Sequence, residues 1–199
     1  MISFLLRQRL ALGAVPAGRV RRRALSSLQR FHESRLFPFS REQVFDVVAD
    51  VDRYCEFVPL CTGSAVFHAT RLAGPAGQES VQAELTVGYP PFHERYTSDV
   101  VLDRPRRIVA TSSAGGRVFQ HMRTLWEFAD AAPGAAGSPV SPFVRGSAAR
   151  AGPATRVRFS IEYEFISALH ARAASLALDK MARSTVTAYL DRCRALYGP

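Results

Sequence analysis

One stretch near the C-terminal end constrains the fold more than any other. From Val157 to Phe165, apolar residues alternate with polar ones, which is the two-residue period of a half-buried β-strand. From Ser167 to about Tyr197, apolar residues recur with helical spacing, and Gly198 is placed to end the helix. A helix of roughly thirty residues is a rod about 45 Å long. The combination predicts a sheet whose apolar face is covered by a single long helix.

Further strands are expected upstream of this one. Turn signals such as Pro90–Pro91 and Gly115–Gly116 separate segments with strand patterns. These segments are Val81–Tyr89, Phe92–Leu102, Arg107–Ser112 and Val118–Phe128. Consecutive strands joined by short turns predict an antiparallel, strongly curved sheet.

The N-terminal part of the body predicts a strand and two helices. A short strand is expected over Arg35–Phe39, and Ser40 with Gln43 has the spacing of a helix capping box. A second short helix is expected over Asp52–Phe57. One face of the first helix carries Val44, Val47, Val48 and Val51. The predicted fold class is therefore α+β, and a space between its curved sheet and long helix would suit an apolar ligand.

Charge is concentrated at the N-terminus. The net charge is +9, but residues 1–30 contain seven arginines and no acid, which leaves 19 basic and 17 acidic residues in the rest. Residues 1–30 are therefore interpreted as a mitochondrial transit peptide, and 31–199 as the folded domain. A secretory signal and a basic arm that binds RNA or a membrane are the alternatives. The nearly neutral body lacks the positive surface typical of nucleic-acid binding, so no nucleic-acid partner is expected.

Two other features limit the function. The three cysteines and five histidines have no zinc or disulfide spacing, so no metal and no cofactor are expected. No apolar run reaches the roughly 18 residues of a membrane-spanning helix. The range 129–155 is rich in Ala, Gly, Pro and Ser, which predicts a disordered loop insert between two strands.

Five stretches of the chain are distinctive when read in order. They are FPFSREQVFDVVADVDRYCEFVPLC (Phe37–Cys61), VGYPPFHERYTSDV (Val87–Val100), TLWEF (Thr124–Phe128), VRFSIEYEF (Val157–Phe165) and RCRALYG (Arg192–Gly198). Together they resemble the mitochondrial coenzyme Q-binding protein family, which belongs to the START-like, polyketide cyclase-like proteins with a helix-grip fold. The resemblance covers roughly residues 33–130 and 155–198, and the insert at 129–155 departs from it.

The resemblance implies a carrier or chaperone for ubiquinone, with no enzymatic activity. Such a protein holds ubiquinone as a ligand in an apolar cavity and supports respiratory electron transport and quinone biosynthesis. It is expected on the matrix side of the mitochondrial inner membrane, in peripheral contact with the bilayer. Complexes of quinone biosynthesis or respiration are the partners that this role implies.

A quinone site needs apolar walls and hydrogen-bond donors, because quinone oxygens only accept hydrogen bonds. Candidate donors are Tyr96, Ser98 and Trp126. Candidate wall residues on the strands are Leu85, Val87, Phe92, Tyr96, Val100, Met122, Trp126 and Phe128. Those on helices and loops are Val47, Val51, Phe57, Val58, Leu60, Leu176 and Met181. The alternative for each of these residues is that it only packs the core.

Two further parts of the predicted site carry specific hypotheses. Glu94 shares a strand face with Phe92 and Tyr96, so an inward Glu94 would either be protonated and donate to a quinone carbonyl, or pair with an arginine or water. The apolar segment 57–60 is predicted to dip into a membrane surface and to open the cavity. A long isoprenoid tail would exceed a typical pocket of about 300–1,000 Å³ and remain partly outside.

Two other functions compete with the carrier. Asp50, Asp52 and Glu56 are close in sequence and could suggest acid–base catalysis, but their setting on the first helices, with no histidine or nucleophile nearby, indicates solvated helix ends instead. A START-like cyclase or hydrolase is therefore one alternative. Association with ribosomes, as in similar bacterial proteins, is the other.

Overall fold

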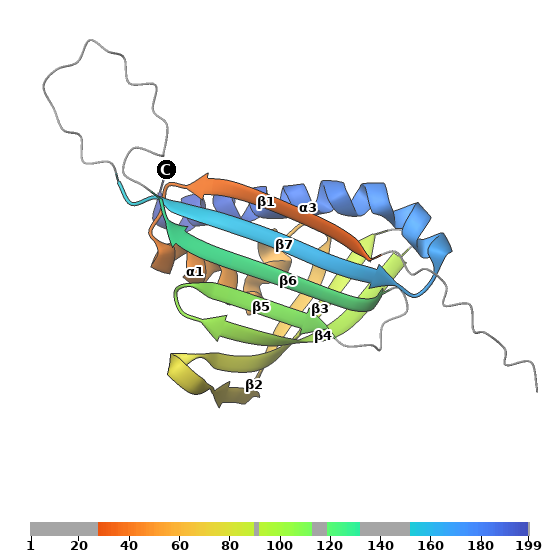
Figure 1. Ribbon diagram of the computed structural model, residues 1–199, viewed down its shortest axis with the longest axis horizontal. Coiled ribbons are helices and arrows are strands. Elements are labelled where there is room, and N and C mark those ends of the chain that lie inside the picture. Colours follow the sequence, from red (N-terminus) through yellow and green to blue (C-terminus); the bar gives the residue numbers. More distant parts are fainter. Residues whose placement is uncertain (1–27, 90–91, 113–118, 132–151, 199) are drawn as a thin grey trace, which may run out of the picture.

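A curved antiparallel sheet lies against one long helix (Figure 1). The computed structural model describes residues 28–89, 92–112, 119–131 and 152–198. In the described residues the sheet has seven strands in the order β1-β7-β6-β5-β4-β3-β2. They are β1 (Gln29–Phe37), β2 (Cys61–Ala73), β3 (Glu79–Tyr89), β4 (Phe92–Asp103), β5 (Arg107–Ser112), β6 (Phe119–Asp130) and β7 (Thr155–Phe165). The helices are α1 (Arg41–Ala49), α2 (Tyr54–Phe57) and α3 (Ala168–Tyr197).

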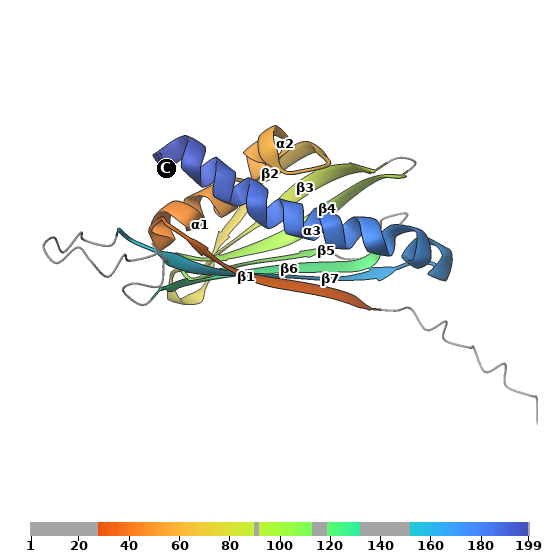
Figure 2. The same ribbon diagram turned by 90° about the horizontal axis from the view of Figure 1, so that it is seen from above.

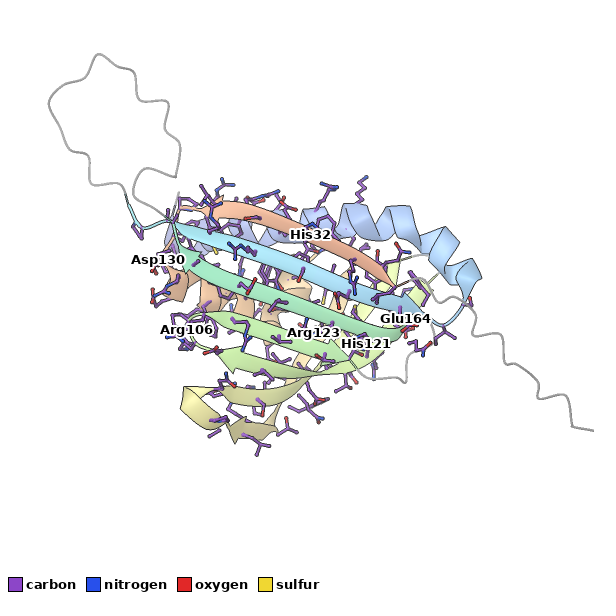
Figure 3. The ribbon with its side chains drawn as sticks, in the orientation of Figure 1. His32, Arg106, His121, Arg123, Asp130 and Glu164 are labelled. Carbon is purple, nitrogen blue, oxygen red and sulfur yellow. The ribbon has the colours of Figure 1, made fainter. Side chains whose placement is uncertain are left out.

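All the helices lie on one side of the sheet (Figure 2). The long helix α3 runs across the inner face, and α1 and α2 lie beside its C-terminal half. The opposite face of the sheet carries no helix in the described part of the chain (Figure 3). This confirms the expected α+β helix-grip arrangement, in which the sheet curves around a C-terminal helix.

Local signals in the sequence set the ends of both longer helices. The Ser40 hydroxyl accepts from the Gln43 amide at 3.2 Å, and the Ser40 amide donates to the Gln43 side chain at 2.9 Å, so the capping box is confirmed. The helix α3 begins directly after Ser167. It ends at Gly198, whose φ of 90° is accessible to glycine and whose amide donates to the Arg194 carbonyl at 2.9 Å.

The first strand is longer than its sequence pattern predicts. Strand β1 begins at Gln29 rather than Arg35, and Arg30 forms an ion pair with Glu162 on β7 at 2.8 Å. The last two residues of the range 1–30 therefore belong to the sheet. The rest of the interpretation as a transit peptide concerns residues 1–27, which lie outside the described residues.

The insert predicted over residues 129–155 is shorter in the structure. Ala129 and Asp130 continue β6, and they pair with Arg156 and Thr155 of β7. The prediction of disorder for the middle of this range falls on residues 132–151, outside the described part.

Strand β2 has no clear sequence signal. Its residues mix Gly63, Ser64 and other small or polar types, and its pairing with β3 shifts register between Phe67 and Leu72. A β-bulge of this kind breaks the two-residue alternation on which strand prediction depends.

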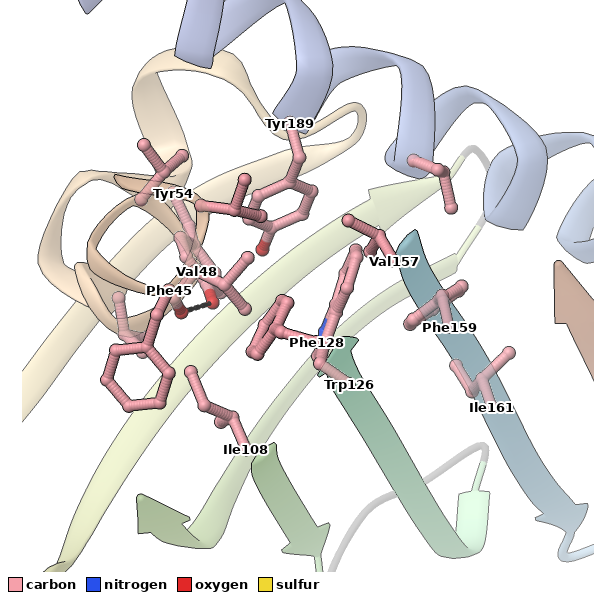
Figure 4. Close-up of a cluster of buried hydrophobic side chains, with 14 of the residues drawn as sticks. Phe45, Val48, Tyr54, Ile108, Trp126, Phe128, Val157, Phe159, Ile161 and Tyr189 are labelled. Atoms are coloured by element: carbon pink, nitrogen blue, oxygen red, sulfur yellow. Dashed lines mark hydrogen bonds between the residues drawn. The ribbon is translucent and has the colours of Figure 1, made fainter. Parts of the chain in front are cut away.

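An aromatic cluster joins α3 to the centre of the sheet (Figure 4). The Trp126 ring on β6 lies 4.4 Å from the Phe159 ring on β7 and 4.7 Å from the Tyr189 ring on α3, measured between ring centroids. All three side chains are buried. On β7 the alternation predicted from sequence is confirmed, because Val157 through Phe165 present every second side chain to the core.

We expect one buried hydrogen bond to contribute measurably to stability. The hydroxyl of Thr155 is fully buried and donates at 2.7 Å to the carbonyl of Phe39, just before α1. Thr155→Val keeps the shape but leaves that carbonyl without its partner, so the free energy of unfolding should fall by about 1–3 kcal/mol. Urea denaturation measures it, with the exposed Thr97→Val as control. Equal stability of the two variants would contradict this assignment.

Candidate ligand cavity

A cavity of about 180 Å³ lies between the inner face of the sheet, α3 and the turn that follows α2. Its lining is mostly apolar. Strands contribute Cys61, Ala83, Leu85, Val87, Gly88, Glu94, Tyr96, Ser98, Val100, Ile108, Ala110, Phe119, Met122, Thr124, Trp126, Phe159, Ile161 and Tyr163. The helical segments and the turn contribute Val51, Tyr54, Val58, Pro59, Leu60, Met181, Ala182, Thr185 and Tyr189.

Small side chains at the centre of the sheet create this space. In the strand register Ala83 lies opposite Ser98, and Ala110 lies opposite Thr124. These four residues form a cavity floor that spans β3 to β6 and lacks large side chains. Because protein interiors are otherwise close-packed, a floor of small residues under a helix leaves an opening.

Large side chains surround the floor. Trp126 and Phe159 stand at one end, where Tyr189 of α3 packs on Trp126 (Figure 4). Leu85 lies opposite Tyr96 toward the other side. The ring of Trp126 thus holds α3 away from the floor, so the helix does not close the space.

Two phenols in the lining pack against each other between the helices. The Tyr54 hydroxyl donates to the carbonyl of Val48 at the end of α1 (Figure 4). The Tyr189 ring lies edge-on to the Tyr54 ring, with ring centroids 5.4 Å apart. Burial raises the pKa of Tyr54 and of Tyr189 well above the ordinary value of 10.0. Both phenols are therefore neutral at physiological pH, and their contacts tie α1, α2 and α3 together.

Other polar groups in the lining are available to a ligand. The Ser98 hydroxyl and the Trp126 indole N–H have no hydrogen-bond partner among the described residues, although both residues are more than nine-tenths buried. Burial also raises the pKa of Tyr96, so its hydroxyl stays a neutral donor. Neither the Ser98 nor the Trp126 donor atom is among the fully buried atoms without a partner, so a ligand or water in the cavity can reach and accept from each of them.

A tight turn, Val58–Cys61, forms part of the cavity lining. The Cys61 amide donates to the Val58 carbonyl at 3.1 Å, and the Gly88 amide of β3 donates to the Leu60 carbonyl at 2.9 Å. Leu60 has a φ of 63°, in the left-handed region where glycine or asparagine is favoured. Its side chain is 38% exposed. The turn therefore presents an apolar side chain outward at the cavity edge, at a conformational cost of about 1–2 kcal/mol.

The sequence profile of the family described as polyketide cyclase / dehydrase and lipid transport matches residues 37–189. This range runs from the end of β1 to Tyr189 and includes the whole described lining.

The chain belongs to this family.

Proteins similar in sequence to this chain differ in what they are named for. A mitochondrial coenzyme Q-binding protein homologue from Xenopus laevis is 32% identical over 84% of this chain, and the chain spans 59% of that relative's length. A ribosome association toxin from Pseudomonas aeruginosa is 24% identical over 83% of this chain and 95% of its own. The resemblance to coenzyme Q-binding proteins is confirmed.

Solved structures share the fold. An aromatase/cyclase from a Streptomyces species superposes with a TM-score of 0.61 at 14% identity, covering 85% of this chain and 96% of that protein. At this identity the similarity concerns the fold alone. It agrees with the helix-grip topology seen here.

Most of the predicted ligand-binding residues lie together around the cavity. Those in the lining are Val51, Val58, Leu60, Leu85, Val87, Glu94, Tyr96, Ser98, Val100, Met122, Trp126 and Met181. The side chains of Phe92 and Leu176 lie outside the described part of the structure. Glu94 is buried in the lining and takes part in interactions there.

Three predicted wall residues do not line the cavity. Val47 is buried on α1, and Phe128 packs against Phe45 of the same helix, with ring centroids 5.8 Å apart. Phe57 packs on the outer side of the tyrosine pair, 5.1 Å from the Tyr189 ring. The prediction of these positions as walls rests on their membership of buried faces, but Val47 and Phe128 lie in the part of the core around α1, and Phe57 packs against the rings of Tyr54 and Tyr189.

Several lining residues were not predicted. Phe159, Ile161 and Tyr163 share the inward face of β7, which its alternation already indicated. Tyr189 lies three residues after Val186 on the apolar stripe of α3. The small floor residues carry no signal of their own, because an alanine in a strand is ordinary until its neighbours across the sheet are known.

The acidic residues proposed for catalysis have structural partners on the surface. Asp52 accepts from the Val66 amide at 2.6 Å, and Glu56 pairs with Arg192 of α3 at 2.8 Å. Asp50 is exposed at the end of α1 and lies near Arg53. None of these three is in the cavity lining.

None of the helices in the described residues is long and apolar enough to cross a membrane. Within the same residues, no group of three or more His, Cys, Asp or Glu side chains is arranged to hold a metal ion.

The buried phenols should make the fold sensitive to high pH. Tyr54, Tyr96 and Tyr189 keep their protons in the folded state above the pKa of 10.0 at which unfolded tyrosines titrate. The folded state then binds more protons than the unfolded state, so the free energy of unfolding should fall as pH rises through 10. This adds to a fall that begins near pH 9, because burial also raises the pKa of the Cys61 and Cys193 thiols above 9.0. Urea titrations between pH 8 and 11.5 measure it, and tyrosinate absorbance monitors ionisation. Ionisation of all six tyrosines near pH 10 in the folded protein would contradict the burial of these three phenols.

Proposed function

We propose that the chain binds ubiquinone in the cavity and acts as a carrier for it. The observation that supports this most directly is the pairing of an apolar cavity with buried donors that lack partners, Ser98 and Trp126. A quinone head has apolar faces and oxygens that accept hydrogen bonds, so it matches both properties. Tyr96, which lies on β4 beside Ser98, supplies a third neutral donor.

The quinone ring is proposed to lie on the small-residue floor. There its faces meet Ala83 and Ala110 below and the α3 side chains above, while Trp126 bounds one edge. With about 180 Å³, the cavity is smaller than typical ligand pockets of about 300–1,000 Å³. It suits a head group rather than a complete polyprenyl quinone, so the tail leaves by the opening near Val58–Cys61.

The tail's exit supports a peripheral position on a membrane. A free isoprenoid tail in water would expose apolar surface, at about 25 cal/mol for each Å². The outward side chain of Leu60 lies at the opening and is itself apolar. We infer that this turn enters the bilayer surface while ubiquinone is exchanged, on the matrix side of the mitochondrial inner membrane.

Binding without turnover is the activity we propose. The carrier would serve respiratory electron transport and quinone biosynthesis, with the complexes of those processes as its partners. The name of the Xenopus laevis relative agrees with binding, whereas the similarity to the aromatase/cyclase concerns the fold alone.

Extraction of the purified full-length chain with organic solvent, followed by mass spectrometry, tests the ligand. Stoichiometric ubiquinone from a quinone-producing host is expected. Another lipid in the same amount would show a carrier with a different cargo. An empty protein that also failed to bind added ubiquinone would contradict the proposal, and its cosedimentation with ribosomes would support the activity named for the Pseudomonas aeruginosa relative instead.

Filling the floor should block the ligand without unfolding the protein. Ala110→Leu places a larger side chain in existing space, so we expect at least tenfold weaker ubiquinone binding with little loss of stability. Quenching of the single tryptophan, Trp126, by a short-chain ubiquinone measures the binding. The matched control is Val109→Leu, on the same strand with the side chain on the other face. Equal binding by both variants would show that the ligand does not lie on the floor.

Leu60 offers a test in which stability and transfer change in opposite directions. Leu60→Gly removes the apolar side chain and suits the φ of 63°, so it should preserve or raise stability while slowing ubiquinone transfer between vesicles. Leu60→Asp should slow transfer at least as much, because a carboxylate opposes entry into the bilayer. A charge at Val58 should act in the same way. Transfer at the wild-type rate by folded Leu60→Asp would show that the turn does not enter the membrane.

A further inference from the structure

A second depression lies on the outer face of the sheet, opposite to the cavity. It is an open groove of about 470 Å³ at the end of the sheet where β4 turns into β5, β6 ends and β7 begins. Figure 3 shows Arg106 and Asp130 at this end of the outer face. The residues of this arginine groove are Arg41, Asp103, Arg106, Arg107, Glu127, Phe128, Ala129, Asp130, Arg156 and Arg158.

The groove has more positive than negative charge. Its five arginines face three carboxylates, whereas the body of the chain is nearly neutral. Two of the carboxylates have an arginine within ion-pair distance: Asp130 lies 3.0 Å from Arg41, and Asp103 lies 3.8 Å from Arg107. The position of the third carboxylate, Glu127, therefore decides which arginines lack an acidic neighbour.

Strand register places the remaining acid between two arginines. Glu127 of β6 lies directly opposite Arg107 of β5 and Arg158 of β7. Arg106 and Arg156 are the surplus, because Arg156 lies opposite Leu36 and Ala129, and Arg106 lies in the turn before β5. Neither has an ion pair with any described residue.

The two surplus arginines border a small floor. Ala129 lies directly opposite Arg156 in the β6–β7 pairing, so no side chain beyond a methyl group fills the space between strands there. Arg106 is fixed at the other side, because its carbonyl accepts from the Phe128 amide at 2.8 Å. Two arginines whose backbone positions are set by the sheet thus flank this part of the groove.

We propose that the arginine groove binds a phosphate group on a small molecule, between Arg106 and Arg156. Guanidinium groups bind phosphate oxygens in pairs and stay charged at all physiological pH values. Two surplus positive charges match one phosphate dianion. The neighbouring acids Asp103, Glu127 and Asp130 disfavour an extended polyanion or an anionic membrane, because either would bring further negative charge against them. This site is separate from the ubiquinone cavity and does not depend on it.

Titration of the full-length chain with inorganic phosphate, followed by amide NMR at constant ionic strength, tests the site. Saturable shifts of Ala129 and Arg156 are expected, with no saturation for chloride. Arg156→Gln and Arg106→Gln should each weaken phosphate binding at least tenfold. Arg123→Gln is the matched control, because Arg123 lies on the same face away from the groove (Figure 3). Ala129→Leu should weaken binding by filling the floor without changing any charge.

Two sets of results would overturn the proposal. One is the absence of saturable phosphate binding, or equal weakening by Arg156→Gln and Arg123→Gln, which would indicate only general surface charge. The other is binding of a single-stranded oligonucleotide, or of vesicles with anionic phospholipid, that depends on Arg156 while phosphate neither binds nor competes. In that case the groove would recognise a polyanion or a membrane rather than a small phosphate compound.

Discussion

The contact between Tyr189 of α3 and Trp126 of β6 determines what the sheet and helix can do together. Their ring centroids are 4.7 Å apart, and Phe159 packs on the other side of the indole at 4.4 Å. Tyr189 also packs edge-on against Tyr54, with ring centroids 5.4 Å apart, and the Tyr54 hydroxyl donates to the Val48 carbonyl at the end of α1. One aromatic stack therefore sets the distance of α3 from the sheet and anchors the two shorter helices to it. Beside the stack, this distance between α3 and the sheet is too large for the small side chains of the floor to reach the helix, so a space remains.

A space of this kind is costly for a protein that does not use it. Cavities made by mutation in protein cores cost about 24 cal/mol of stability for each Å³. On this scale an empty apolar cavity of 180 Å³ weakens a fold by about 4 kcal/mol. A typical domain is stable by only about 5–15 kcal/mol, so this cost is a substantial part of the total. Larger residues at Ala83 and Ala110 would recover much of it. A ligand that fills the space and accepts from Ser98 or Trp126 recovers it as well, which is why the cavity and its unpartnered donors together favour a binding function.

The sequence predicts local structure here much better than the shape of the site. The capping box at Ser40, the end of α3 at Gly198 and the inward face of β7 all follow from short-range patterns, and the structure confirms them. The floor depends instead on which residues lie opposite each other across four strands, and alternation within one strand does not contain that register. Val47 and Phe128 show the same limit from the other direction. Their burial could be predicted, but the pattern does not say which part of the core they face.

The two faces of the sheet use the same register for opposite purposes. Inside, small residues face each other across β3–β4 and β5–β6 and leave an apolar space under α3. Outside, most arginines lie near an acid, so the surface charge is largely balanced. At Ala129 that balance fails, because a methyl group stands opposite Arg156 where an acid would neutralise it. A small residue in a strand pair thus marks a site on either face, and whether the site takes an apolar or an anionic group depends on what stands around it.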